Sequence, residues 1–272
     1  MNVPEPPDTG KEAPISEETR SLLAWDAYPR SAKYDPAWVL GNEMGPNVLW
    51  LTEALAGVMD LKPGMRVLDL GCGRGMSSVF LAKEFGVQVF AADLWISPTD
   101  NFVRFEKAGL SDRVFPIQVE AHSLPFARSY FDAALSMDAY HYFGTDDLYL
   151  KYFAGFLKEG AQVGIVVPGL AKDFEGPVPG HLTRRQENGS VFWDPKECFS
   201  FHTASWWKRH WEVTGLIDVE RAERLPGGWE LWLRWEKARQ GRGSTGFPSE
   251  AETLEADGGR YLGFVRMTGR KR

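Results

Sequence analysis

Short apolar runs alternate with amphipathic stretches along most of the 272-residue chain. A short apolar run between turn residues predicts a buried strand, and apolar residues three or four positions apart predict a helix. We expect strands near residues 66–70, 87–93, 113–119, 131–137, 161–168, 217–224 and 261–268, and helices near residues 48–59, 76–85, 99–109, 145–157 and 203–214. This alternation predicts an α/β fold with a doubly wound, mostly parallel, seven-stranded, Rossmann-like sheet. The period-two pattern of 261–268 suits an antiparallel last strand.

Segments that interrupt this alternation divide the chain further. Residues 1–20 hold four prolines among charged residues, which predicts a disordered tail. Residues 21–60 combine an aromatic-rich stretch with one helix, and we interpret them as an N-terminal lid and helix. Residues 61–272 form the main domain, with lid insertions at about 169–202 and 226–259. The first insertion follows the fifth strand, at the edge where open α/β sheets bind their ligands.

Composition and charge narrow the possible functions. The net charge of -6 argues against nucleic-acid binding, which requires clustered positive charge. The two cysteines, Cys72 and Cys198, provide neither a disulfide framework nor a zinc-binding spacing, so we expect no metal. No apolar run is long enough to span a membrane, and the polar, proline-rich start is unlike a signal peptide. We therefore expect a cytoplasmic protein without a membrane span.

One strand-to-helix junction concentrates the candidate chemistry. The predicted strand 66–70 leads into Gly-Cys-Gly-Arg-Gly at 71–75, and a helical pattern begins at Met76. Glycines permit a sharp turn and let a ligand approach the backbone, while a helix start presents unpaired N–H groups to an anion. A dinucleotide fingerprint, G-x-G-x-x-G, would need glycine where Met76 stands, so the spacing argues against a nicotinamide oxidoreductase.

Asp69 precedes these glycines, and the resulting D-x-G-x-G-x-G resembles motif I of the class I S-adenosylmethionine-dependent methyltransferases. The resemblance implies that Gly71 and Gly73 line the methionine part of the cofactor S-adenosylmethionine. It also implies that Asp69 helps to hold the amino group of this cofactor, and it places Cys72 inside the cofactor turn. On this basis residues 61–272 are a cofactor-binding catalytic domain. A plain strand-to-helix turn is the alternative interpretation.

The next predicted strand ends in Asp93, about 20 residues after the glycines, as in nucleoside-binding folds. A carboxylate there can accept hydrogen bonds from both ribose hydroxyls of a bound nucleoside, and Leu94 follows it at the cofactor. Enzymes that use NAD have the same geometry. Asp93 therefore indicates that a nucleoside binds, but it does not distinguish NAD from S-adenosylmethionine. The alternative role for Asp93 is to cap the helix that begins near Pro98.

Another block extends the resemblance beyond the third strand. Glu120-Ala-His-Ser-Leu-Pro-Phe resembles the G-D-A-x-x-L-P-F segment of small-molecule methyltransferases. By that match Glu120 contacts the adenine amino group, and Ala121 and His122 flank the adenine ring. This chain has Glu120 where the family has aspartate. A histidine in a surface loop is an equal alternative for His122.

The fourth predicted strand resembles the F-D-x-x-x-S-x-D-A strand of the same family, whose end borders both cofactor and acceptor. The resemblance places Met137 beside the cofactor, and Asp138, Tyr140, His141 and Tyr142 beside the transferred methyl group. His141 could remove a proton from the acceptor, since a pKa near 6.5 suits base catalysis at neutral pH. Asp138 could orient His141 or neutralise a cationic substrate. Packing of His141 and its neighbouring tyrosines under a lid is the alternative.

The sequence Tyr34-Asp-Pro-Ala-Trp-Val-Leu-Gly-Asn-Glu resembles the entrance segment of phosphoethanolamine and related phosphobase N-methyltransferases. Those enzymes pair a lid tyrosine, for which Tyr34 is the candidate here, with a histidine in a D-A-x-x-H block. This chain reads D-A-Y-H, so His141 stands one residue early and Tyr142 occupies the place of the histidine. Six tryptophans could converge with Tyr34 into a cation-attracting site, or could form a lid core or a dimer interface: Trp193, Trp206, Trp207, Trp211, Trp229 and Trp232.

These observations predict an S-adenosylmethionine-dependent methyltransferase that acts on a small-molecule acceptor, with a slight preference for a nitrogen atom. Oxygen and carbon acceptors, including an acyl chain, remain open, and so does a binding module without turnover. The expected partners are the small-molecule acceptor and, as a possibility, a second copy of the chain. The candidate catalytic residues are His141, Tyr140, Asp138 and Tyr34. The candidate cofactor-binding residues are Asp69, Gly71, Cys72, Gly73, Asp93, Leu94, Glu120, Ala121, His122 and Met137.

Overall fold

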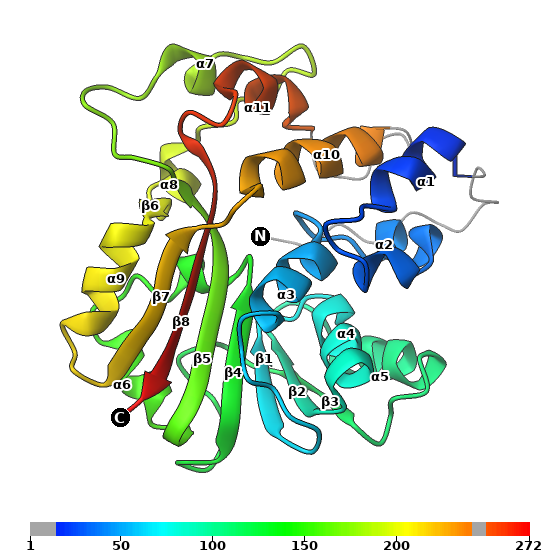
Figure 1. Cartoon of the computed structure of the whole chain (residues 1–272), viewed down its shortest axis with the longest axis vertical. Helices are drawn as coiled ribbons and strands as arrows, with labels where there is room; N and C mark the ends of the chain where they lie inside the picture. The colour runs from blue at the N-terminus through cyan, green and yellow to red at the C-terminus, as the bar shows by residue number, and fades with distance from the viewer. Residues whose placement is uncertain (1–14, 241–248) are drawn as a thin grey trace.

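The computed structural model describes residues 15–240 and 249–272. Its strands are β1 (Arg66–Leu70), β2 (Gln88–Asp93), β3 (Val114–Gln118), β4 (Phe131–Met137), β5 (Leu157–Leu170), β6 (His202–Thr203), β7 (Ile217–Arg224) and β8 (Leu262–Lys271). They form one sheet in the order β3-β2-β1-β4-β5-β8-β7, and the short β6 pairs with β5. The first five strands run parallel, whereas β8 is antiparallel to both neighbours (Figure 1). The predicted fold class is confirmed, and β6 is the strand that the sequence pattern did not predict.

The helices cover both faces of the sheet, as a parallel sheet requires. They are α1 (Glu17–Leu23), α2 (Pro36–Gly41), α3 (Val48–Ala56), α4 (Met76–Phe85), α5 (Pro98–Lys107), α6 (Tyr149–Ala154), α7 (Gly180–Thr183), α8 (Pro195–Cys198), α9 (Ala204–Glu212), α10 (Gly228–Gln240) and α11 (Ala251–Asp257), with short 3-10 turns at Ser31–Lys33 and Tyr140–Tyr142. One apolar core joins α3, α4 and α10 to the sheet, and a second core joins α6 and α9 to the opposite face (Figure 1).

Several boundaries differ from the predicted ones. Residues 1–14 of the predicted tail and the Gly/Ser-rich turn at 241–246 lie outside the described residues, while the remainder of the tail enters α1, which begins at Glu17. Ser16 explains this start, because its hydroxyl accepts a hydrogen bond from the Thr19 backbone N–H and so caps the helix. The helix expected at 145–157 is shorter, since β5 already pairs with Phe131 at Leu157.

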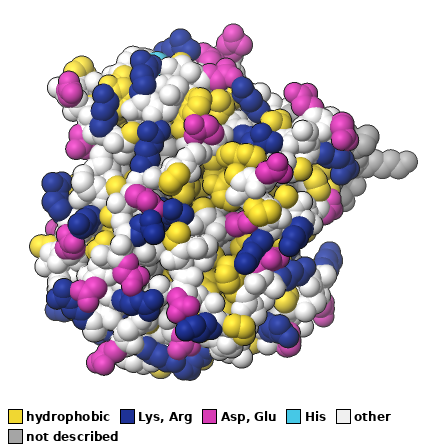
Figure 2. Space-filling model, viewed as in Figure 1, with side chains coloured by type: hydrophobic (Ala, Val, Ile, Leu, Met, Phe, Trp, Pro, Cys, Tyr) yellow, Lys and Arg dark blue, Asp and Glu magenta, His cyan; other side chains and the backbone are white. Residues whose placement is uncertain are grey.

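Charge on the molecule is mixed. In the space-filling view of Figure 2, Lys and Arg side chains alternate with Asp and Glu side chains, and hydrophobic atoms gather between them near the centre. This face therefore carries no continuous positive patch. Among the helices in 15–240 and 249–272, none has both the length and the apolar character needed to cross a bilayer.

Candidate active site

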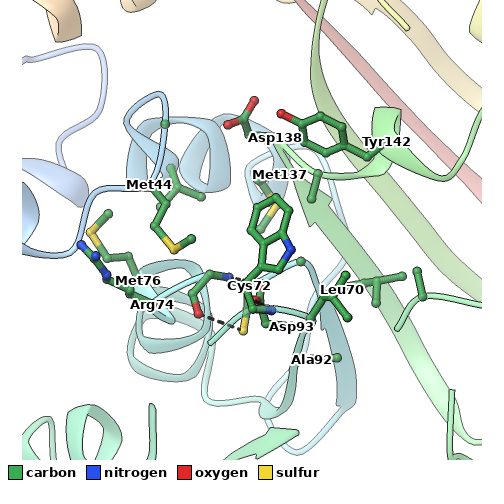
Figure 3. Close-up of a pocket in the computed structure, with 18 of the residues that line it drawn as sticks. Met44, Leu70, Cys72, Arg74, Met76, Ala92, Asp93, Met137, Asp138 and Tyr142 are labelled. Atoms are coloured by element: carbon green, nitrogen blue, oxygen red, sulfur yellow. Dashed lines mark hydrogen bonds between the residues drawn. The ribbon is translucent and has the colours of Figure 1, made fainter. Parts of the chain in front are cut away.

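A cavity of about 190 Å³ opens beyond the carboxyl ends of β1, β2 and β4 (Figure 3). Four sheet-end segments contribute to its wall: the glycine turn after β1, the residues after β2, those after β3, and those after β4. A fifth segment, residues 42–48 before and at the start of α3, lies across it, and we call this the roof segment. The wall thus combines distant parts of the chain, at the edge where open α/β sheets bind ligands. Nine of the predicted residues line it: Gly71, Cys72, Gly73, Asp93, Leu94, Glu120, Ala121, Met137 and Asp138.

The glycine turn fits a closely approaching ligand. Gly71 and Gly73 both adopt positive φ, +77° and +54°, a region that favours glycine. A Cβ added at Gly71 would lie 2.3 Å from the Cβ of Ala139, and one at Gly73 would lie 2.9 Å from the Met44 sulfur. The Ala92 carbonyl accepts hydrogen bonds from the N–H groups of Gly71 and Cys72, at 2.8 and 3.1 Å. The glycine turn therefore forms one side of the cavity, and the missing side chains leave room for a ligand next to the backbone.

Asp93 stands at the end of β2 with a nearly buried carboxylate that lines the cavity. One oxygen accepts a hydrogen bond from Gly73 N–H at 2.8 Å, and the other accepts from Trp95 and Ile96 N–H at 2.8 and 3.0 Å. The carboxylate is thereby fixed between the glycine turn and the loop after β2. Its position, at the wall and beside the turn, suits a partner for ribose hydroxyls. The helix that follows is capped by Ser97 and not by Asp93.

Glu120 lines the cavity, whereas His122 does not. The Glu120 carboxylate accepts the His122 backbone N–H at 2.8 Å and contacts the His122 ring nitrogen Nδ1 at 2.8 Å. Burial alone would raise the pKa of Glu120, but the bonds to His122 outweigh burial and lower that pKa. The histidine also packs edge-on against Tyr149, with ring centroids 4.9 Å apart. His122 therefore contacts Glu120 from outside the cavity wall instead of flanking a ligand.

Asp69 is fully buried below the glycine turn and does not line the cavity. Its Oδ2 accepts hydrogen bonds from the hydroxyls of Ser77 and Ser78, both at 2.6 Å. Burial raises the pKa of Asp69 to about 6, although the two serine hydroxyls oppose the shift. These contacts tie the end of β1 to the first turn of α4. The geometry thus gives Asp69 a role in shaping the turn, and its contact with the cofactor amino group stays a prediction.

Asp138 lines the cavity beyond the end of β4, near Tyr142 (Figure 3). It follows β4 and adopts φ of +53°, a conformation that non-glycine residues seldom adopt and that is found disproportionately at functional sites. Burial raises the pKa of its carboxyl to about 8. The roof segment lies close, because a Cβ added at Gly45 would be 2.5 Å from Asp138 Oδ2. Asp138 is therefore a half-buried residue on the cavity wall, and the raised pKa of its carboxyl brings the loss of its proton close to neutral pH.

Tyr142, which stands at the family's histidine position, faces the cavity, whereas His141 does not. Tyr142 lines the cavity, and Figure 3 shows its hydroxyl on the side where Asp138 lies. The side chain of His141 is buried, does not line the cavity and packs against Phe201, with ring centroids 5.9 Å apart. Burial lowers the pKa of His141 to about 3, so the ring stays neutral. His141 therefore lies in the 3-10 turn Tyr140–Tyr142 outside the cavity wall, which favours the packing interpretation over the predicted role as a base.

The other two predicted catalytic tyrosines also lie elsewhere. Tyr34 packs on Trp38 and on Phe80 of α4, with ring centroids 5.6 and 5.8 Å apart. Tyr140 is buried in the core on the α6 and α9 face, against Trp207 and other aromatic rings. Neither residue lines the cavity. Both tyrosines take part in apolar packing. The spacing of aromatic residues in the sequence does not show whether such a residue packs in a core or lines a ligand site.

Residues outside the predicted set complete the wall. The roof segment contributes Asn42, Met44, Gly45, Pro46 and Val48, and the sheet ends contribute Arg74, Trp95, Ala139, Tyr142 and Phe143. Of these, the roof segment belongs to the predicted N-terminal lid, and Tyr142 stands at the family's histidine position. Among the described residues that line the cavity, none comes from the insertions at 169–202 and 226–259, and the six tryptophans considered above are also absent. The aromatic argument for a nitrogen acceptor is therefore lost.

Comparison with known proteins places these features in a family. Residues 67–160 match the sequence profile of a methyltransferase domain. Over 152 residues the chain is 30% identical to the methyltransferase GfsG of Streptomyces halstedii, covering 54% of this chain and 51% of that protein. It is 29% identical over 112 residues to phosphoethanolamine N-methyltransferase 3 of Arabidopsis thaliana, covering 41% of this chain and 23% of that protein. The names of the curated relatives include N-, O- and C-methyltransferases.

A solved structure shows the same fold. Phosphoethanolamine N-methyltransferase 2 of Haemonchus contortus, in complex with S-adenosyl-L-methionine, superposes with a TM-score of 0.65 at 20% identity, over 93% of this chain and 60% of that chain. The chain spans about half of the length of the Streptomyces relative and about a quarter of the Arabidopsis relative. Residues 67–160 thus match a methyltransferase domain, in agreement with the resemblance to the class I S-adenosylmethionine-dependent methyltransferases, and the solved structure shows the same fold.

Proposed function

We propose that this class I S-adenosylmethionine-dependent methyltransferase methylates a small molecule, with nitrogen as the preferred acceptor atom. One observation carries the proposal: the glycine turn, Asp93 and Asp138 line a single cavity. The glycine turn and Asp93 suit a nucleoside cofactor. Asp138 adds a titratable carboxyl to the wall of the same cavity. S-adenosylmethionine supplies an electrophilic methyl group when it is bound.

Residues at different places along the cavity have different proposed roles. The turn at Gly71 and Gly73 leaves space for the methionine part of the cofactor, and Asp93 holds the ribose. Glu120 stands where the adenine amino group is expected. The roof segment covers the cavity and excludes water, which strengthens each electrostatic contact inside it. Alignment of the acceptor against the methyl group would account for much of the rate enhancement.

Asp138 is the proposed proton acceptor. A carboxyl with a pKa of about 8 is matched to a base that works near neutral pH. The Tyr142 hydroxyl can hold the acceptor beside it. Burial raises the pKa of the Tyr142 hydroxyl, and the Asp138 carboxyl raises it further, so an acidic side chain lies near this hydroxyl at the cavity. An amine is favoured in such surroundings because it arrives with positive charge or leaves a proton behind, whereas a phosphorylated acceptor would be repelled.

An oxygen acceptor is the second candidate, since the same carboxyl can remove a hydroxyl proton. The decisive first test is calorimetry of the whole protein with S-adenosylmethionine, S-adenosylhomocysteine and, as the control, NAD. We expect heat with the first two alone. Methyl-labelled S-adenosylmethionine is then offered with pools of amines, phenols, thiols and fatty acids, and mass spectrometry locates the label. Label on oxygen would replace the nitrogen preference, and no binding of either sulfur compound would contradict the proposal as a whole.

A further inference from the structure

Helix α10 carries three tryptophans whose indole N–H groups bond to two other segments, α11 with its N-cap and the roof segment. Trp229 donates to the carbonyl of Leu254 in α11 at 2.8 Å, and Trp232 donates to the Glu250 carboxylate at 2.9 Å. Trp235, the most buried of the three, donates to the Gly45 carbonyl in the roof segment at 2.8 Å. Although α10 contributes no residue to the described wall of the cavity, it therefore contacts the segment that covers it.

The roof segment lies between α10 and the cavity. On the α10 side, Glu43 forms an ion pair with Arg239 at 2.8 Å, and both side chains are buried. On the cavity side, Met44 lies over Gly73, since a Cβ at that glycine would be 2.9 Å from the methionine sulfur. Gly45 lies as close to Asp138. The hydrogen bond from Trp235 therefore ends on a roof residue that lies against Asp138.

We propose that Trp235 is a positioning residue, which fixes the roof segment over the cofactor cavity through its hydrogen bond to Gly45. The inference rests on the proposed function, because it assigns to the second insertion a part in cofactor binding. Without the indole N–H, the Gly45 carbonyl loses this hydrogen bond. The position of the roof segment relative to Gly73 and Asp138 is then less well fixed. A cofactor held between the glycine turn and the roof segment would then bind more weakly, although no group that touches it has changed.

The test compares Trp235→Phe with Trp229→Phe. Both variants remove an indole N–H that donates at 2.8 Å to a backbone carbonyl from the same helix, but only the first bond ends on the roof. Calorimetry of each purified protein measures the affinity for S-adenosylhomocysteine, and urea unfolding without ligand measures stability. We expect about tenfold weaker binding in Trp235→Phe alone, as for one buried hydrogen bond lost, and a loss of stability in both variants.

If Trp235→Phe does not fold, a measurement on the parent protein can still test the inference. With ¹⁵N-labelled tryptophan, the indole N–H of Trp235 should exchange with solvent more slowly when S-adenosylhomocysteine is added, and that of Trp229 should not change. Equal affinity in the two folded variants, or an unchanged Trp235 signal in a parent protein that binds the ligand, overturns the inference alone. A parent protein that does not bind S-adenosylhomocysteine overturns the proposed function and the inference with it.

Discussion

The two ends of the cavity are built differently. At the cofactor end, Asp93 accepts three backbone hydrogen bonds, and the glycine turn is bonded to Ala92, so these groups are in place before a ligand arrives. At the acceptor end, Asp138 sits on a strained backbone, and burial raises its pKa to about 8. The cofactor end is thus fixed by backbone contacts, whereas the acceptor end holds a side chain that can change its protonation. The first arrangement suits binding, and the second suits chemistry.

The strongest way to break this comparison is Asp138→Asn. If Asp138 takes the proton, the rate of methyl transfer to an acceptor found in the screen should fall about 1,000-fold, within the usual range for loss of a general base. The affinity for S-adenosylmethionine should stay near that of the parent, because the cofactor end is untouched. The parent rate should rise towards pH 8, and that rise should vanish in the variant. A variant that retains the pH-dependent rate would remove the proton role from Asp138.

Stability of the same variant gives an independent measurement. The folded pKa of Asp138 lies above the ordinary value of 3.8, so the folded state holds the proton more tightly than the unfolded state. The resulting stabilisation is complete below about pH 4 and is lost as the pH rises to about 8. The free energy of unfolding should therefore fall less steeply across this interval in Asp138→Asn than in the parent, as measured by urea titrations. Asp112→Asn, at an exposed position, is the control.

Asp93→Ala tests the cofactor end. Two ribose hydrogen bonds to a carboxylate would be lost together with the anchor of the Gly73 N–H, so the affinity for S-adenosylmethionine should fall about 100-fold. Calorimetry measures this loss, and Asp112→Ala should bind as the parent does. At saturating cofactor the variant should recover much of its methyl-transfer rate, in contrast to Asp138→Asn. Retained affinity would remove Asp93 from the cofactor site.

The smallest effect is expected at His141, next to the acceptor end but outside it. His141→Gln should transfer methyl groups within about threefold of the parent, far from the loss of a general base, with the same pH profile between pH 6 and 9. The folded pKa of about 3 lies below the ordinary 6.5, so His141 contributes stability that is present above pH 6.5 and lost as the pH falls towards 3. The variant should therefore resist acid unfolding better than the parent. A large loss of the methyl-transfer rate in His141→Gln would instead support a catalytic role for His141.

Local sequence was sufficient for the sheet and for the cofactor end. Strand β1 and helix α4 occupy the predicted ranges, because the apolar run, the glycines and the helical pattern all lie within about 20 consecutive residues. The direction of β8 followed from its period-two pattern. Gly71, Gly73 and Asp93 also line the cavity as expected, since a parallel strand carries whatever follows it to one edge of the sheet.

Tertiary packing decided the acceptor end. From the sequence, His141 and Tyr142 are adjacent polar aromatic residues, and only the turn Tyr140–Tyr142 determines which of them faces the cavity. The roof over the cavity comes from residues 42–48, and α10, about 190 positions later, holds it through the bond from Trp235 to Gly45. Pairings at such separation leave no periodic signal in the chain, because each partner reads locally as part of an apolar or turn segment. The sequence by itself predicted the glycine turn and the acid after the second strand, and the folded structure decided which other side chains line the cavity beside them.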